Sequence, residues 1–345
     1  YLVGDGEINL FTRSPYDEIS CSFIDELSRK LRKDKSCQQY PDIMAFAFWC
    51  RDKNLERHRL LFEDEFCRKG RGLIFHISPS NVPINFAFTF IFGVLAGNGN
   101  IVRVPSKHFP QIDMVCKKIE ETLLDDRFIS IKRQTAIISC ERDIEIIDYL
   151  SSVCDIRVIW GGDSSISEIR KSPISPKAFD VTFADRYSIG IINSKKYLEG
   201  SADETRRCIE GFYNDTYLMD QNACSTPHLI FWEGNKDDNE RAKKEFWKAV
   251  ASIATKYSLE DMKVSEKYTM LCNYMIDLEE IDSINKYDNF LYVVHMNKLP
   301  EDITVLRGKY GMFFDYDIEA IHQIGTYISP KFQTLAYYGI DKCRL

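Results

Sequence analysis

The spacing of apolar residues predicts two helical stretches at the start of the chain. Over residues 16–33 the apolar positions recur every fourth residue, the spacing of one face of an α-helix: Ile19, Phe23, Leu27 and Leu31. Pro15 lies just before them, where proline favours a helix start. A second helical pattern covers residues 42–66 and is rich in aromatic and charged side chains. Both stretches are typical of helices that pack one face on a core and expose the other.

From residue 72 onward, short β-rich runs alternate with helical patterns. Strands are expected at 72–77, 101–104, 135–139 and 156–160, and helices at 85–97, 109–125 and 143–153. Alternating units of this length imply a parallel sheet with helices on its faces. In such sheets ligands bind at the carboxyl ends of the strands, so the segments that follow those ends are the places to look for chemistry.

A second α/β block is expected to begin near residue 180. Its predicted strands cover 188–193, 228–232, 291–295 and 304–306, and its predicted helices cover 203–218 and 237–257. No linker rich in proline, glycine or serine marks the join between the two blocks.

Composition and charge exclude several classes of protein. A length of 345 residues with 44% apolar residues, 22 Phe and 18 Tyr indicates a globular protein and excludes disorder. The net charge of −7 offers no basic surface of the kind that nucleic acid needs. The longest apolar run, residues 86–97, is shorter than the roughly 20 residues that span a bilayer, and the start lacks a signal-peptide pattern. We therefore expect a cytoplasmic protein without a membrane span.

The eleven cysteines and six histidines show no metal-binding or redox spacing. No CxxC motif occurs, the cysteines are at least 13 residues apart, and the histidines are isolated. We therefore predict no metal site. The usual role of such a cysteine is that of a small buried apolar residue.

One cysteine has a different context. Cys224 lies in the polar run 220–227 (DQNACSTP), between a predicted helix and a predicted strand. A thiolate attacks acyl carbons well, and a loop of small polar residues offers backbone N–H groups to the resulting oxyanion. Cys224 is therefore the candidate nucleophile, with burial in a core as the alternative.

Two further segments follow predicted strands. In residues 78–83 (SPSNVP) two prolines hold a short turn, in which Asn81 either donates to a substrate oxygen or satisfies the turn and the next helix. Gly161 and Gly162 precede a helical stretch, where backbone can approach a phosphate or a planar ring, or simply form a tight turn. The classical GxGxxG and GxxxxGK[ST] fingerprints are absent from the sequence.

Taken in order, four segments resemble the aldehyde dehydrogenase superfamily and, more closely, the LuxC-type fatty acyl-CoA reductases. They are 79–83 (PSNVP), 97–106 (GNGNIVRVPS), 158–162 (VIWGG) and 220–227 (DQNACSTP), and the similarity covers roughly residues 70–340. The resemblance implies an α/β, aldehyde dehydrogenase-like fold. Its parts would be N-terminal helices with a Rossmann-type nucleotide-binding domain (1–185), a catalytic α/β domain that carries the cysteine (186–315), and a C-terminal return segment (316–345), beyond which the family continues.

The resemblance implies an NAD(P)H-dependent reductase that forms an aldehyde. Cys224 would attack an acyl-CoA or another activated acyl donor, and the amide of Asn81 with the backbone N–H of Cys224 would form the oxyanion hole. Hydride from a nicotinamide cofactor would then reduce the thioester. Relatives that form carboxylates need a glutamate to activate water, and the corresponding stretch 181–187 (VTFADRY) has none. That departure fits a reductase, and Asp185 is not assigned as a base.

The cofactor-binding positions implied by the resemblance are Ser78, Pro79, Arg103, Pro105, Ser106, Lys107, Gly161, Gly162 and Asp163. Where the superfamily has a lysine before Pro-Ser, this chain has Val104. Arg103 and Lys107 are the cations left for a ribose 2′-phosphate, so we expect NADPH as the hydride donor, with NADH as the alternative.

Other functions stay open at this point. The same scaffold could reduce an acyl phosphate, or it could carry a thioester on Cys224 without reductase activity; a binding scaffold is a third alternative. An acyl-transferring partner protein and a homo-oligomer are also implied by the resemblance. The apolar residues 84–95 fit either a tunnel for a long acyl chain or an ordinary core, so the sequence leaves the acyl group unspecified.

Overall fold

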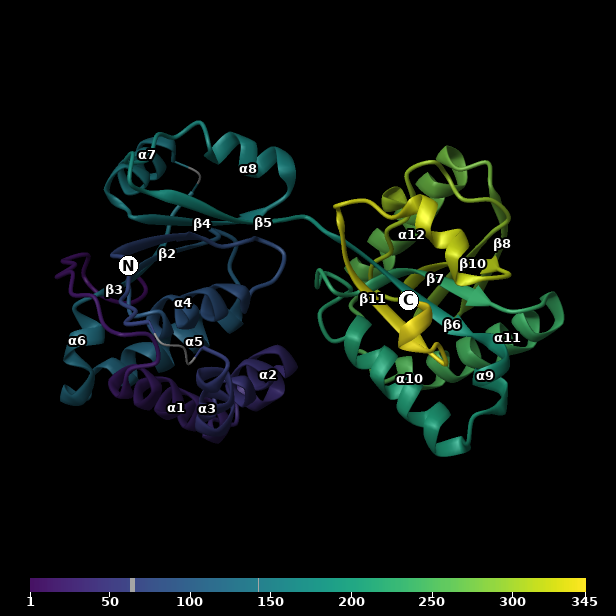
Figure 1. The fold of residues 1–345 in the computed structure, drawn as a ribbon, viewed down its shortest axis with the longest axis horizontal. Coiled ribbons are helices and arrows are strands. Elements are labelled where there is room, and N and C mark those ends of the chain that lie inside the picture. The colour runs from purple at the N-terminus through teal and green to yellow at the C-terminus, as the bar shows by residue number, and fades with distance from the viewer. Residues whose placement is uncertain (63–65, 142) are drawn as a thin grey trace. The chain divides into compact units, whose positions relative to one another are not determined.

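The computed structural model describes residues 1–62, 66–141 and 143–345. The chain divides into two compact units, Tyr1–Asp185 and Arg186–Leu345. Each unit has its own sheet (Figure 1). Apolar clusters pack on both faces of each sheet.

The first unit is built on a five-stranded parallel sheet with the strand order β3-β2-β1-β4-β5. The strands are β1 (Leu73–Ile77), β2 (Gly99–Val104), β3 (Thr135–Ser139), β4 (Ile156–Gly161) and β5 (Phe179–Ala184). The chain runs from β1 to β2 and β3 on one side, then crosses back to β4 and β5 on the other. The order therefore reverses between β1 and β4, which is where open α/β sheets bind their ligands.

Helices cover both faces of this sheet (Figure 1). They are α1 (Glu18–Lys33), α2 (Pro41–Trp49), α3 (Asp52–Leu60), α4 (Asn85–Leu95), α5 (Pro110–Leu123), α6 (Ile129–Lys132), α7 (Ile144–Val153) and α8 (Asp163–Ile169). The first six belong to the apolar cluster on one face, and α7 and α8 to the cluster on the other. In α1 the predicted repeat is buried at Phe23, Leu27 and Leu31.

The single helix predicted over residues 42–66 is wrong. The chain forms α2 and α3, separated at Cys50 and Arg51. The side chain of Asp25 in α1 accepts a hydrogen bond from the backbone N–H of Asp52 at 3.0 Å, so a neighbouring helix fixes the start of α3. A contact of this kind leaves no trace in local periodicity. Residues 63–65 of the predicted helix lie outside the described residues.

The second unit is built on a six-stranded sheet with the order β11-β6-β7-β10-β9-β8. The strands are β6 (Tyr187–Asn193), β7 (Pro227–Glu233), β8 (Ile281–Tyr287), β9 (Leu291–Met296), β10 (Met312–Ile318) and β11 (Phe332–Tyr338). β8 pairs antiparallel with β9, and the other pairs are parallel. One face carries α12 (Asp261–Asp277), and the other carries α9 (Ser194–Glu199), α10 (Ala202–Thr216) and α11 (Lys236–Ala254) (Figure 1).

The strand predicted at residues 304–306 is wrong, because this segment forms a short 3-10 helix, Ile303–Val305. The carboxylate of Asp302 accepts the backbone N–H of Thr304 at 2.9 Å, and this local cap competes with extended backbone.

Strand β10 is buried around a carboxylate. Asp315 is fully buried and accepts hydrogen bonds from Trp247 Nε1 at 2.9 Å and from His295 Nδ1 at 2.5 Å. Trp232 Nε1 donates to the same side chain at 3.3 Å. These donors supply the partners that a buried carboxylate requires, so the strand can carry an acidic residue at its centre.

Candidate functional site

Three of the predicted segments meet at one edge of the first sheet. In the register of the sheet, Ile77 at the end of β1 lies opposite Arg103 of β2 and Ile159 of β4. The segments that continue from these three neighbouring strands therefore leave the sheet at its carboxyl edge, beside the point where the strand order reverses. They are Ser78-Pro79, Pro105–Lys107 and Gly161–Asp163.

Ser78 is buried at this edge. Its backbone N–H donates to the carbonyl of Arg103 at 3.1 Å. Its hydroxyl has no hydrogen-bond partner among the described residues. A buried hydroxyl without a partner is costly, which makes Ser78 a group that a ligand could satisfy.

The two cations at the end of β2 have different surroundings. Arg103 is buried, and its guanidinium donates to the carbonyl of Cys140 at 3.0 Å, which links the ends of β2 and β3. Lys107 is exposed, with its amine 5.0 Å from the ring centroid of Phe109. Of the two, Lys107 is the charge that solvent reaches.

Packing leaves Gly162 open but is tight at Gly161. β4 ends at Gly161, and Gly162 is the N-cap of α8 with an ordinary extended backbone. A Cβ built on Gly162 would have no heavy atom of the described residues within 4 Å, and one on Gly161 would lie 3.3 Å from the Cβ of Ser165. Asp163 is exposed at the start of α8. The backbone at Gly162 is therefore open to close approach.

Asn81 is exposed in the turn between β1 and α4. The N-cap of α4 is Ile84, so Asn81 does not cap this helix. Within the described residues, no hydrogen bond joins the Asn81 side chain to another group. Its amide is available to a ligand.

In the second unit, Cys224 lies in the loop between α10 and β7, and this loop is pinned by Gln221. The buried amide of Gln221 accepts the backbone N–H groups of Gly311 at 2.6 Å and Met312 at 3.1 Å, and it donates to the carbonyl of Met312 at 2.9 Å. Asp220 and Gln221 both have positive φ, 54° and 59°. Non-glycine residues rarely adopt this backbone, and the three hydrogen bonds offset its cost.

Further contacts fix both ends of the loop. The carboxylate of Asp220 pairs with the amine of Lys263 at 3.1 Å and also accepts the hydroxyl of Tyr257. The hydroxyl of Thr226 donates to the carbonyl of Asp215 at 2.8 Å. The cysteine therefore sits in a loop held on each side of it.

The Cys224 side chain is exposed and has a partner. Gln333 of β11 donates from Nε2 to its sulfur at 3.1 Å. Ser188 of β6 donates from its hydroxyl to the backbone carbonyl of Cys224 at 2.7 Å. Sequence analysis missed Gln333, because strand β11 was not predicted.

Most of the other cysteines are less accessible. Cys37, Cys50, Cys116 and Cys154 are buried, whereas Cys67 and Cys343 are exposed with Cys224. Burial raises the pKa of Cys21 and of Cys154 to about 11, which keeps those thiols neutral at pH 7.

His228 follows the cysteine loop but belongs to the core. Burial, followed by the positive charge of Arg307, lowers the pKa of His228 to about 4. Its ring stacks on that of Tyr187 at 5.7 Å. The imidazole is therefore neutral at pH 7.

We expect Gln221→Leu to destabilise the second unit by about 1–3 kcal/mol, because the amides of Gly311 and Met312 would lose their acceptor. Urea denaturation followed by tryptophan fluorescence measures this change. Ser225→Ala, an exposed change in the same loop, is the control and should shift the free energy of unfolding by less than about 0.5 kcal/mol. Equal unfolding curves for both variants would contradict the pinning role of Gln221.

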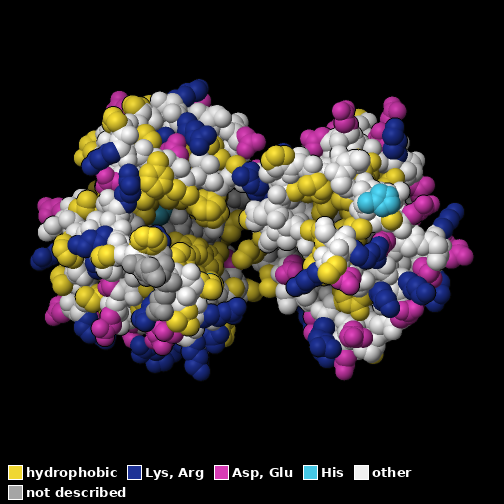
Figure 2. Space-filling view, in the orientation of Figure 1, with side chains coloured by type: hydrophobic (Ala, Val, Ile, Leu, Met, Phe, Trp, Pro, Cys, Tyr) yellow, Lys and Arg dark blue, Asp and Glu magenta, His cyan; other side chains and the backbone are white. Residues whose placement is uncertain are grey.

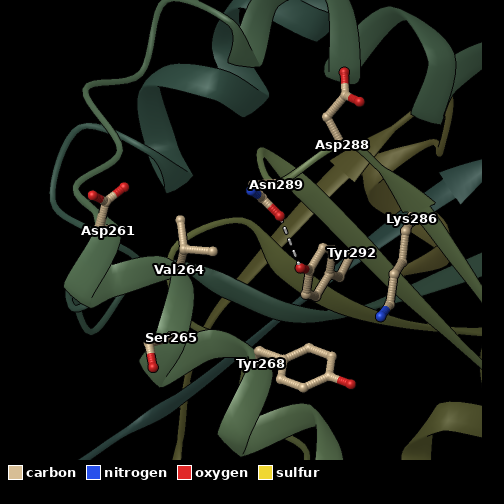
Figure 3. Close-up of a pocket in the computed structure, with 8 residues that line it drawn as sticks. All are labelled: Asp261, Val264, Ser265, Tyr268, Lys286, Asp288, Asn289 and Tyr292. Carbon is tan, nitrogen blue, oxygen red and sulfur yellow. Dashed lines mark hydrogen bonds between the residues drawn. The ribbon is translucent and has the colours of Figure 1, made fainter.

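A pocket of about 650 Å³ lies beside α12 (Figure 3). The amine of Lys286 lies 4.8 Å and 5.1 Å from the ring centroids of Tyr268 and Tyr292 at its wall. None of the residues that line it belongs to the predicted site.

The surface and the helices add three observations. Basic and acidic side chains are interspersed over the visible face of each unit (Figure 2). In the part of the chain that the structure describes, no three His, Cys, Asp or Glu side chains are arranged to hold a metal ion. Across those same residues, no helix has both the length and the apolar character of a membrane span.

Comparison with known sequences gives a family match and one similar protein. The profile of the acyl-CoA reductase (LuxC) family matches residues 55–267, more than half of the chain. A long-chain acyl-protein thioester reductase from Vibrio harveyi is 25% identical over 177 residues, which are 50% of this chain and 34% of that protein. The match thus spans about a third of the relative's length.

Comparison with solved structures confirms the aldehyde dehydrogenase-like α/β fold. An NAD-dependent benzaldehyde dehydrogenase from Corynebacterium glutamicum has a TM-score of 0.65 and 11% identity, covering 96% of this chain and 78% of that one. A betaine aldehyde dehydrogenase from Staphylococcus aureus, solved with NAD+, has a TM-score of 0.59 and 11% identity, covering 89% and 67%. Proline utilization A from Bradyrhizobium japonicum has a TM-score of 0.64 and 13% identity, but this chain covers only 35% of it.

Proposed function

The chain belongs to the acyl-CoA reductase (LuxC) family, and from this premise we propose that it reduces an activated acyl group to an aldehyde through a thioester on Cys224. The observation that carries the proposal is the state of that cysteine. Its side chain is exposed, a side-chain amide donates to its sulfur, and its loop is pinned on both sides. A nucleophile held in place in this way pays less entropy when it attacks.

The proposed first step is transfer of the acyl group. The sulfur of Cys224 attacks the acyl carbonyl, a C–S bond forms, and the carbonyl electron pair moves to oxygen. The Asn81 amide and the backbone N–H of Cys224 donate to this oxyanion. When the carbonyl reforms, the donor leaves with its bonding electron pair and takes a proton from solvent. The Asn81 amide has no hydrogen-bond partner among the described residues, which supports its part in this step.

A nicotinamide cofactor fits the carboxyl edge of the first sheet. The buried hydroxyl of Ser78 lacks a partner among the described residues, and the backbone at Gly162 is open to close approach. Together with Pro79, Gly161 and Asp163, these residues flank the point where the strand order reverses. When bound, the cofactor supplies the hydride that converts the thioester to the aldehyde level.

We propose NADPH as the preferred donor because Lys107 offers an accessible positive charge near this edge, where the neighbouring Pro105 and Ser106 also lie. Arg103 is buried, one guanidinium nitrogen donates to the carbonyl of Cys140, and its Nε has no partner among the described residues, so Lys107 is the more accessible of the two cations. The proposal therefore rests on Lys107.

Lys107→Ala is expected to weaken NADPH binding by about tenfold and to leave NADH binding unchanged, because only NADPH carries the 2′-phosphate. Isothermal titration of both nucleotides measures this difference. Lys117→Ala removes an exposed charge from α5 and is the control. If the affinities for both nucleotides fall equally, or if neither falls, Lys107 does not bind the 2′-phosphate.

The proposed substrate is an acyl thioester, either acyl-CoA or an acyl group presented on a partner protein. The name of the Vibrio harveyi relative supports a thioester. The test is to mix the protein with NADPH and an acyl-CoA, follow the loss of NADPH absorbance, and trap the aldehyde. Oxidation of NADPH with an acyl phosphate but not with a thioester would point to the other donor class. Acylation of Cys224 without NADPH oxidation would indicate that the protein carries a thioester but has no reductase activity.

A further inference from the structure

Two paired strands of the second unit contact Cys224, one at its backbone carbonyl and the other at its sulfur. β11 and β6 run parallel, with Thr334 opposite Ser188. Ser188 binds the carbonyl of the cysteine at 2.7 Å, and Gln333, the residue before Thr334, binds its sulfur at 3.1 Å. Gln333 lies at an irregularity of this pairing, between the pairs Phe332–Tyr187 and Thr334–Ser188, and its amide donates to the thiol from there.

An amide N–H interacts differently with the two forms of a thiol. A neutral thiol sulfur is a weak acceptor, whereas a thiolate accepts a charge-assisted hydrogen bond that is roughly twice as strong as a neutral one. A donor on the sulfur thus favours the thiolate, and the thiolate is the form that attacks. Gln333 carries no charge, so it does this without adding a cation to the site.

We infer that Gln333 is a catalytic residue of the proposed reduction, whose N–H stabilises the Cys224 thiolate both as nucleophile and as leaving group. This inference rests on the proposed function. Before attack, the hydrogen bond from Gln333 stabilises the thiolate. As the C–S bond forms, the sulfur gives up its charge and this hydrogen bond weakens.

The same contact acts at the end of the cycle. A bound nicotinamide cofactor would supply the hydride that reduces the acyl carbon and would itself be oxidised, which leaves an alkoxide on a carbon still bonded to sulfur. The alkoxide reforms the C=O bond, the C–S bond breaks, and its electron pair returns to the sulfur of Cys224. Gln333 then donates to the regenerated thiolate, so it lowers the barrier to release of the aldehyde.

The test measures the reactivity of the thiol without substrate or cofactor. Wild type and Gln333→Leu are treated with iodoacetamide, and the rate at Cys224 is followed by peptide mass spectrometry. At pH 7 we expect alkylation of Cys224 to be about tenfold slower in the variant, because the thiolate loses a charge-assisted hydrogen bond. The exposed Cys67 and Cys343 serve as internal references and should react at unchanged rates.

The pH dependence separates a donor from a loop anchor. The thiolate fraction of any thiol rises with pH, so the difference between the two proteins should shrink as the pH of the assay is raised from 7 to 10. Gln333→Glu keeps the side-chain length but replaces the donor with a negative charge, so it should react more slowly than Gln333→Leu at pH 7. Tyr337→Phe, an exposed change on the same strand, is the matched control.

Two outcomes would overturn the inference: equal rates at pH 7, or an equal slowing at pH 7 and pH 10. The failure of the proposed function looks different. Turnover that survives Cys224→Ala would overturn the thioester mechanism whatever the alkylation rates are.

Discussion

Replacing Cys224 by alanine is expected to abolish both acyl-enzyme formation and aldehyde production. The side chain is exposed, its sulfur accepts a hydrogen bond from Gln333, and hydrogen bonds to Gln221 and Asp220 hold its loop. Alanine keeps the backbone contacts, including the bond from Ser188 to the carbonyl of residue 224, so the loop should stay folded. What is lost is the nucleophile.

Intact mass after incubation with a panel of acyl-CoAs measures this result. Wild type should gain one acyl mass, and the panel also reports the preferred chain length. Cys67→Ala and Cys343→Ala are matched controls, because these cysteines are also exposed, and both variants should be acylated at the wild-type rate. Acylation of Cys224→Ala at the wild-type rate would place the nucleophile elsewhere.

The part of the fold that the sequence predicts best is the parallel sheet of the first unit. Strands β1 to β4 were expected close to their observed bounds, because the sequence of a strand that is buried on both faces is a continuous apolar run. β8 and β10 do not follow that pattern. β8 is largely exposed, and β10 carries Asp315, whose charge is balanced by donors from other elements. Local composition cannot reveal partners that only the tertiary fold supplies.

The candidate site also has a part that the sequence predicts and a part that depends on the tertiary fold. The segments after β1, β2 and β4 could be predicted, because the carboxyl ends of parallel strands gather at one edge whatever the side chains are. Two contacts of the site could not be predicted from the sequence. Gln333 is 109 residues from Cys224 and reaches it through the pairing of β11 with β6. Gln221 pins the loop to Gly311 and Met312, about 90 residues away. Arg103 was expected to offer its charge to a cofactor, and its burial is likewise a tertiary effect.

Asn81→Ala is expected to slow acylation of Cys224 by about 100-fold, the scale of losing one oxyanion-hole donor. The side chain is exposed, it has no partner among the described residues, and it does not cap α4. Its removal should therefore leave the free energy of unfolding nearly unchanged, within about 0.5 kcal/mol. A structural cap would give the opposite result, a loss of about 1 kcal/mol with normal turnover.

The rate is measured by quenched mass spectrometry of the acyl-enzyme, beside nucleotide affinity from titration. Nucleotide affinity should change little in Asn81→Ala, since the proposed role of the lost donor is to bind the acyl oxygen. Asn81→Asp preserves size but opposes the negative oxygen with a carboxylate, so it should be at least as slow as the alanine variant. Ser80→Ala, at the exposed neighbouring position, is the control. If Asn81→Ala acylates as fast as Ser80→Ala, the oxyanion is stabilised by other groups and Asn81 has no part in the step.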